Sequence, residues 1–145
     1  MIDLGEDPLK LDRQVCFALS VASRSVIAIY RPLLEPYGLT HPQYLVMLAL
    51  WERSPRSVKD LGTSLRHEPA TLSPLLKRLE TLGYVTRARS RSDERQLTVE
   101  LTEKGRELRT EALKIPYRVV ETLGMEVAEL EALHAVLTRV IDATA

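Results

Sequence analysis

The chain has 145 residues, 45% of them hydrophobic and 28% charged, which suits one globular domain with its own core. Its longest apolar run, Tyr44 to Trp51, is too short to span a bilayer, and its acidic N-terminus is unlike a signal peptide, so we expect no membrane partner. A single cysteine cannot form a disulfide within its own chain, which agrees with a reducing compartment and a cytoplasmic location.

The net charge is zero, but the charges are unevenly spread. Residues 53–95 carry ten Lys or Arg against five Asp or Glu, residues 1–52 carry four against six, and residues 96–145 carry six against nine. A basic centre between acidic flanks favours a nucleic-acid partner over one exposed face. The alternative is that these side chains only solvate exposed helices.

Two helices are predicted before the basic centre. Apolar residues recur at helical spacing over residues 11–34, and Pro36 follows the end of this helix. Thr40 and Gln43 form a capping-box pattern that opens a second helix, over about residues 42–53, which is apolar nearly all round and should be central.

Two further helices are predicted within the basic centre. Ser57 and Asp60 form a second capping-box pattern, which opens a short helix that Gly62 weakens or ends. Pro69 at the first position and Gly83 just past the last bound a longer helix. Its inward-facing residues are expected to be Leu72, Leu75, Leu76 and Leu79.

The period then changes from helical to alternating. Residues 84–91 and 96–101 are predicted to form two strands, joined by a polar hairpin tip. Thr102 is expected to cap a helix that runs from position 103 to about Ile115, before Pro116. A last helix with an apolar stripe is predicted over about residues 126–143, so the fold class is mainly α with a small β-hairpin.

A short helix, a turn, a longer helix and an arginine-rich hairpin form the order of a winged helix-turn-helix module. The longer helix fits the major groove, and arginines on the hairpin suit the narrower minor groove. Asp93 is expected to orient Arg95 through a bidentate pair. An ordinary solvated hairpin is the alternative. The predicted DNA-binding residues are Thr71, Ser73, Pro74, Lys77, Arg78, Arg87, Arg89, Arg91, Asp93 and Arg95.

The long first helix and the apolar last segment flank this module. Helix-turn-helix proteins commonly dimerise to read two half-sites. We therefore expect one domain over residues 1–145, in which residues 11–36 and 103–145 form a homodimer interface around a DNA-binding module at 42–101. The alternative is that these helices only cover the core of a monomer.

Several segments together match the pattern of a known family. They are Leu11-Asp-Arg-Gln-Val-Cys-Phe-Ala-Leu19, Tyr30-Arg-Pro-Leu-Leu34, Pro42-Gln-Tyr-Leu45, Leu50-Trp-Glu52, Thr71-Leu-Ser-Pro-Leu-Leu-Lys-Arg-Leu-Glu80 and Ser92-Asp-Glu-Arg95. In these segments the chain resembles the MarR family of transcriptional regulators and, within it, the OhrR group of organic-hydroperoxide sensors. The resemblance extends from Leu11 to about Pro116.

The resemblance implies a homodimeric repressor that binds pseudo-palindromic operator DNA and leaves it when an organic hydroperoxide oxidises Cys16. It also places Tyr30 as one of two tyrosines that hydrogen-bond the thiolate. His41 stands at the position of the second tyrosine, where an imidazole could donate one hydrogen bond and an imidazolium would favour the thiolate. Residues 67–70 also depart from the family pattern, so base contacts are not carried over for Glu68 or Ala70.

The chemistry of Cys16 has alternatives. By itself, a lone cysteine on an apolar helix face is more often an inert hydrophobe. Tyr30 lies 14 residues, or about 21 Å, farther along the same predicted helix, so contact needs a second chain. No second cysteine can resolve a sulfenic acid within the chain, so a mixed disulfide with a small cellular thiol, or overoxidation, is the expected next step.

Three other functions compete with peroxide sensing. One is a repressor that releases DNA on binding a small aromatic ligand, with Cys16 passive. Another is a one-cysteine peroxidase, which leaves the basic hairpin unexplained; we therefore predict no enzyme and no cofactor. The third, a metal sensor, ranks low because His41, His67 and His134 lack compact ligand spacing.

Overall fold

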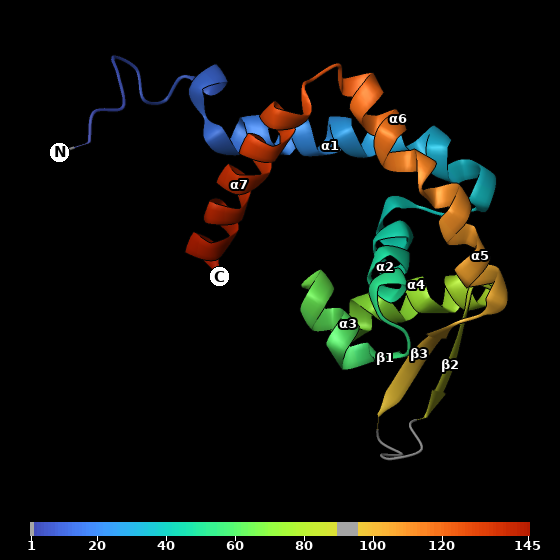
Figure 1. Ribbon diagram of the computed structural model, residues 1–145. Coiled ribbons are helices and arrows are strands. Elements are labelled where there is room, and N and C mark those ends of the chain that lie inside the picture. Colours follow the sequence, from blue (N-terminus) through green and yellow to red (C-terminus); the bar gives the residue numbers. More distant parts are fainter. Residues whose placement is uncertain (1, 90–95) are drawn as a thin grey trace.

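A computed structural model describes residues 2–89 and 96–145 (Figure 1). Short 3-10 turns, η1 (Leu11–Arg13) and η2 (Glu35–Tyr37), precede and follow the first helix. The helices are α1 (Val15–Leu34), α2 (His41–Glu52), α3 (Val58–Leu65), α4 (Pro69–Thr81), α5 (Glu103–Ala112), α6 (Lys114–Leu123) and α7 (Val127–Thr144). The strands are β1 (Arg56–Ser57), β2 (Val85–Arg89) and β3 (Leu97–Leu101).

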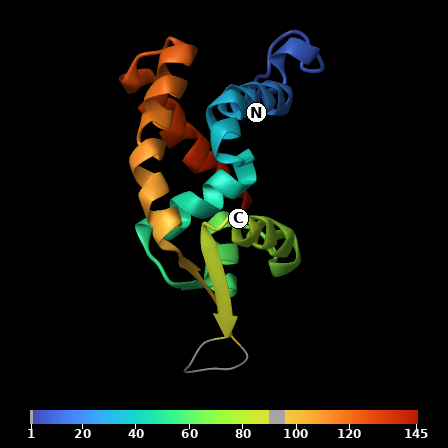
Figure 2. The ribbon, with the colours of Figure 1, turned by 90° about the vertical axis from the view of Figure 1, so that its right-hand side faces the viewer.

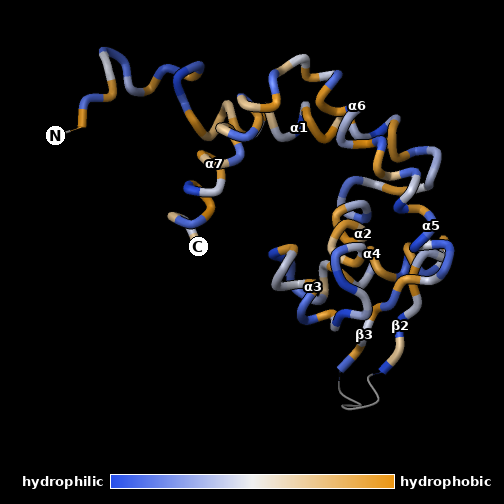
Figure 3. Tube along the Cα trace, in the orientation of Figure 1, coloured by the Kyte–Doolittle hydropathy of each residue, from blue (hydrophilic) through white to orange (hydrophobic). Residues whose placement is uncertain are grey.

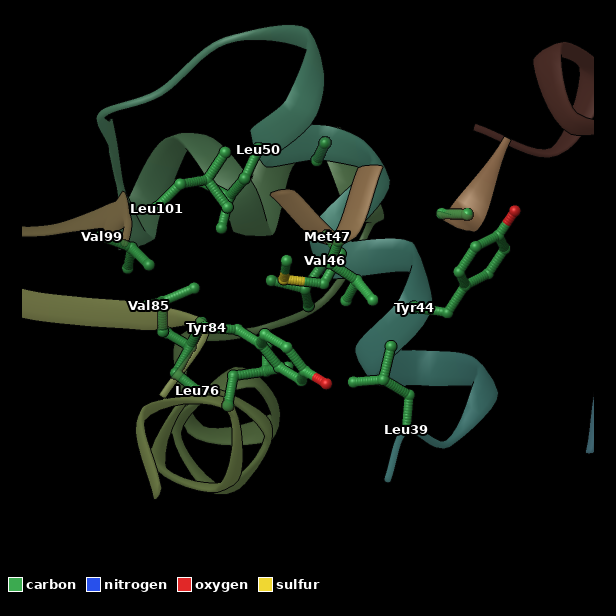
Figure 4. Close-up of a cluster of buried hydrophobic side chains, with 14 of the residues drawn as sticks. Leu39, Tyr44, Val46, Met47, Leu50, Leu76, Tyr84, Val85, Val99 and Leu101 are labelled. Carbon is green, nitrogen blue, oxygen red and sulfur yellow. The ribbon is translucent and has the colours of Figure 1, made fainter. Parts of the chain in front are cut away.

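The core lies where α2 meets α4 and the sheet. Figure 4 shows Met47 and Leu50 of α2 pointing toward Val85 and Val99 of the strands, with Leu76 of α4 alongside. All five side chains are buried, and each contributes about 1.5–3 kcal/mol through removal of apolar surface from water. The prediction of a central second helix is confirmed by this packing.

Polar caps set the helix starts. The Gln43 Oε1 accepts a hydrogen bond from the Thr40 backbone N–H at 2.9 Å, and the Ser57 Oγ accepts one from the Asp60 N–H at 3.0 Å. Both capping predictions are therefore confirmed. The prediction for Gly62 was wrong, because α3 continues through it to position 65.

The sheet has the order β1-β3-β2, and both pairings are antiparallel. In the hairpin, Val85 pairs with Leu101 and Arg89 with Leu97, so the prediction of two strands here is confirmed. The strand β1 was not predicted, because two residues are too short to show a period. The hairpin tip at residues 90–95 lies outside the described residues.

The segment after the hairpin differs from the prediction. We expected one helix ending before Pro116, but α5 ends at Ala112 and α6 begins at Lys114. Proline removes the hydrogen bond to the carbonyl four residues earlier and clashes with that carbonyl, so the break falls at position 112 rather than at 116. Pro116 then lies in the first turn of α6. Backbone N–H groups in that turn have no intrahelical partner, so the proline costs no hydrogen bond there.

The helices α1, α6 and α7 lie at the end of the molecule opposite the hairpin (Figures 1 and 2). Within the chain, α1 buries only Leu34 and α7 buries no residue. Apolar positions recur along both helices without cover from other elements (Figure 3). Their exposed large hydrophobic residues are Val15, Phe17, Val21, Ile27, Val127, Leu133, Val136, Val140 and Ile141.

Among the described residues, one segment is long and apolar enough to cross a membrane, judged by length and composition alone. It is α1 extended to Tyr37. It carries Arg24 and Arg31 within its span. An amphipathic helix that packs against a protein partner passes the same test, so this property does not distinguish lipid from protein cover.

Candidate functional site

The helix α4 presents one apolar and one polar face. Leu72, Leu76 and Leu79 are fully buried and Leu75 is half-buried, so the predicted inward face is confirmed. The opposite side is exposed. The residues predicted for DNA contact on this exposed side are Thr71, Ser73, Pro74, Lys77 and Arg78.

Arg56 is a buried arginine that the sequence did not single out, and it connects α2, β1 and α3. The Arg56 Nε lies 2.7 Å from the Asp60 Oδ2, its Nη1 donates to the Ala49 carbonyl at 3.0 Å, and its Nη2 donates to the Ser64 Oγ. The Arg53 Nη2 approaches the same Asp60 oxygen at 2.8 Å. The network joins the end of α2 to β1 and α3. It therefore holds α3, the first helix of the helix-turn-helix, against α2.

This network also sets the protonation of Asp60. The hydrogen bond from Arg56, and the charges of Arg56 and Arg53, hold the pKa of the Asp60 carboxyl below its ordinary value. Because the folded-state pKa is lower than the unfolded one, the contribution to stability is present above the ordinary carboxyl pKa. It is lost as the pH falls through the folded-state pKa.

The substitution Arg56→Met is expected to lower the free energy of unfolding by about 1–3 kcal/mol, because it leaves the buried Ala49 carbonyl without its hydrogen-bond donor, while Asp60 keeps its ion pair with Arg53. Urea unfolding followed by circular dichroism measures this change. Arg53→Met is the matched control, since its side chain is exposed and its loss should cost less than about 1 kcal/mol. Equal losses in the two variants would contradict the role of the buried contacts.

On the hairpin, the structure changes the interpretation of Arg87. Its backbone N–H donates to the Glu80 Oε2 at 3.2 Å, and its Nη2 pairs with the Glu80 Oε1 at 3.2 Å. The partly buried Arg87 side chain therefore joins β2 to α4, and its guanidinium is already engaged by a carboxylate. Arg89 is exposed at the end of β2. Arg91, Asp93 and Arg95 lie outside the described residues, so their roles stay predictions.

A second cluster lies where α1 packs against α2. The ring centroids of Tyr30 and His41 are 4.9 Å apart in an edge-on contact, and the Tyr44 ring lies 5.6 Å from Tyr30 and 6.3 Å from His41. Gly38, whose φ is 73°, lies in the turn between the helices, and beyond this turn the start of α2 contacts α1. Two of the predicted sensing residues, Tyr30 and His41, are thus brought together.

Burial decides the protonation of these rings. It lowers the pKa of His41 below its ordinary value, so the imidazole is neutral at neutral pH and has one N–H to donate. Burial raises the pKa of Tyr30, and burial with the neighbouring Tyr30 raises the pKa of Tyr44 to about 12. All three rings are therefore neutral hydrogen-bond donors near pH 7.

Cys16 is not part of this cluster within one chain. It is exposed near the start of α1, and Tyr30 lies 14 residues farther along the same helix, a separation of about 21 Å. Val15 and Phe17, its neighbours in the sequence, are exposed apolar residues. The thiol is accessible in the single chain, and any contact with Tyr30 and His41 requires a second copy.

Comparison with known proteins places the chain in a family. The family model of the transcriptional regulator SarA/Rot matches residues 28–112. The HTH-type transcriptional regulator TtmR of Methylorubrum extorquens is 48% identical over 128 residues, covering 88% of this chain and 66% of that protein. The organic hydroperoxide resistance transcriptional regulator of Bacillus subtilis is 38% identical over 136 residues, covering 94% and 92%.

The chain belongs to the SarA/Rot and MarR type of winged-helix transcriptional regulators. The predicted family and fold class are confirmed. Among solved structures, AbfR of Staphylococcus epidermidis superposes with a TM-score of 0.78 at 33% identity, covering 94% of this chain and 95% of that one. Reduced AbfR bound to DNA gives 0.79 at 31% identity, covering 94% and 96%. AbfR is also known in an overoxidized form bound to DNA and in a disulfide form.

One further hollow bears on the alternatives for this regulator. It lies between α2 and the α5–α6 junction, and its lining combines the Tyr44 and Trp51 rings with the single basic side chain of Arg109. The lining also includes the acidic Glu52, and an aromatic wall of this kind suits a flat aromatic molecule. The hollow is separate from the exposed face of α4.

Proposed function

We propose that the protein is a homodimeric repressor that binds operator DNA and releases it when an organic hydroperoxide oxidises Cys16. The observation that carries DNA binding is the exposed face of α4, which combines short hydroxyls at its start with Lys77 and Arg78 one turn later. Hydroxyls near the helix start suit base edges, and the basic residues suit phosphates. The hairpin arginines would then follow the adjacent minor groove.

The uncovered apolar faces of α1 and α7 support the homodimer. A monomer would leave both in water, whereas a two-fold partner would cover them with the same surfaces. A dimer also gives two copies of α4, which fit one face of DNA when they are about 34–36 Å apart, one helical turn.

The arrangement of the Tyr30–His41 pair supports a sensing site shared between subunits. Two α1 helices that cross antiparallel near the two-fold axis would bring Cys16 of the partner subunit to the Tyr30 end of this one. Neutral phenol and imidazole N–H or O–H groups would then donate hydrogen bonds to the thiolate and favour that form. The name of the Bacillus relative and the disulfide form of AbfR agree with this proposal. Overoxidized AbfR is bound to DNA, so we propose the disulfide step, and not overoxidation, as the one that releases the operator.

The reaction needs only the thiolate and the peroxide for its first step. The Cys16 sulfur attacks the outer peroxide oxygen, the O–O bond breaks, the alkoxide leaves and takes up a proton, and the sulfur becomes a sulfenic acid. A small cellular thiol then forms a mixed disulfide and the sulfenic oxygen leaves as water. The added bulk of the mixed disulfide would displace α1 and change the spacing of the two α4 helices.

A direct test uses a fluorescent duplex selected from random sequence by the reduced protein. Anisotropy should show tight binding, release on addition of about one equivalent per subunit of cumene hydroperoxide together with a small thiol, and recovery after excess dithiothreitol. Binding that persists after complete conversion of Cys16 to the mixed disulfide, verified by mass spectrometry, would overturn the sensing proposal but not DNA binding.

The hollow lined by Trp51 and Arg109 favours a second candidate, release by a small aromatic molecule with Cys16 passive. The same assay separates the two, because this mechanism acts on the fully reduced protein and needs no peroxide. Turnover of hydroperoxide with excess reductant would instead indicate the peroxidase.

The substitution His41→Tyr, which restores the residue of the OhrR pattern, is expected to change the pH profile of Cys16 oxidation. At about pH 8 the buried His41 is neutral, so both proteins should react within about threefold of one another. Below its lowered pKa the wild-type ring gains a proton, and this positive charge favours the thiolate. The wild-type rate should therefore fall less steeply with acid than that of the variant. Trapping of the sulfenic acid with dimedone measures the rates, and parallel profiles would contradict this role of His41.

A further inference from the structure

An open basic hollow lies at the turn between α3 and α4, separate from the face of α4 assigned above to DNA. Its lining is Lys59, Gly62, Thr63, Arg66, His67, Glu68 and Pro69. Lys59, Thr63 and Arg66 are all exposed and lie four and three residues apart, so they share one side of α3 and its C-terminal cap.

The backbone of the turn holds Arg66 beside the start of α4. The His67 N–H donates to the Gly62 carbonyl at 2.9 Å, and a Cβ at position 62 would lie only 2.6 Å from the His67 carbonyl oxygen. Arg66 itself is left-handed, with a φ of 58°, and it is the one non-glycine residue with positive φ among those described. Such a conformation is uncommon and strained for a residue with a side chain.

The lining of the hollow carries more positive than negative charge. Arg53 and Arg56 have an acidic partner in Asp60, and Arg87 has one in Glu80. In the part of the chain that the structure describes, neither Lys59 nor Arg66 has an ion pair. The acidic side chain in the lining is Glu68, so two cations face one carboxylate.

We infer that Lys59 and Arg66 bind a phosphate of the DNA backbone while α4 lies in the major groove. In a helix-turn-helix, the first helix crosses the backbone and the second enters the groove, and α3 is that first helix. A phosphodiester carries one negative charge, which matches the excess of one cation in the hollow. The inference rests on the proposed DNA binding and adds to it a contact that positions the protein without reading sequence.

The substitution Arg66→Gly separates this contact from a structural role. Glycine adopts the left-handed conformation without strain, so the melting temperature is expected to stay the same or rise. Affinity for the selected duplex and for unrelated DNA should fall alike, by about three- to tenfold at moderate salt. The plot of log affinity against log salt should become less steep by about 0.9 for each phosphate lost, hence about 1.8 for a dimer. Lys59→Gln should produce the same change of slope.

Lys114→Gln is the control, because it removes an exposed cation from α6 at the other end of the molecule and should leave the slope unchanged. A wild-type slope in Arg66→Gly, or the same decrease in Lys114→Gln, overturns the phosphate contact while DNA binding stands. A wild-type protein that binds neither duplex overturns the proposed function itself.

Discussion

Cys16→Ser is expected to bind operator DNA as tightly as the wild type and to keep it in the presence of organic hydroperoxide. The serine hydroxyl occupies nearly the same volume at an exposed position of α1, so neither the fold nor the reduced dimer should change. It is not a nucleophile toward a peroxide at neutral pH, so the first step of sensing is removed. In the wild type, one equivalent of cumene hydroperoxide together with a small thiol should weaken binding by about 100-fold, the upper range of ordinary allosteric coupling. In the variant the change should be less than about twofold.

The same titration contains its own control for general oxidative damage. The chain has three methionines, and a large excess of oxidant would convert them to sulfoxides in both proteins. Release that occurs in wild type and Cys16→Ser at the same peroxide concentration would therefore assign the response to another residue. Release by a small aromatic molecule in both proteins would favour the hollow beside Trp51 and Arg109.

The elements that the sequence predicted best were those with signals at both ends. The helix α4 has Pro69 at its start, Gly83 with a φ of 85° after its end, and a row of leucines between them. The α5–α6 break was placed wrongly because a proline acts on the carbonyl four residues before it, which a reading of Pro116 as a stop signal ignores. The strand β1 was missed because its pairing with β3 is a long-range contact that two residues cannot signal.

The candidate sites show the same limit. Exposure of Lys77 and Arg78 followed from helical spacing, because the buried leucines fix which side of α4 faces out. The ion pair of Arg87 with Glu80 did not follow, since it depends on how β2 returns beside α4. Nor did the contact of Tyr30 with His41, which arises from the reversal of the chain between α1 and α2.

Adding negative charge to the apolar stripe of α7 is expected to abolish tight operator binding. Leu133 and Val140 are exposed in the single chain and lie seven residues apart on one side of the helix, where the proposed partner would cover them. In the double variant Leu133→Glu and Val140→Glu, each carboxylate would have to lose its water in the interface without a cation to pair with. The protein should therefore sediment as a monomer and bind each half-site singly. Loss of the bivalent contact should weaken binding by at least about 100-fold.

The double variant Ala128→Glu and Ala135→Glu is the matched control. These alanines are exposed, keep the same seven-residue spacing, and position 135 lies about 200° around the helix from Leu133. This variant adds the same charge to the same helix and should remain a dimer with wild-type affinity. Both variants should keep the circular dichroism of the wild type, because α7 buries no residue against the DNA-binding module. A Leu133→Glu, Val140→Glu protein that stays dimeric would move the interface away from α7. One that is monomeric yet binds the duplex at wild-type affinity would show that this regulator reads DNA without a partner.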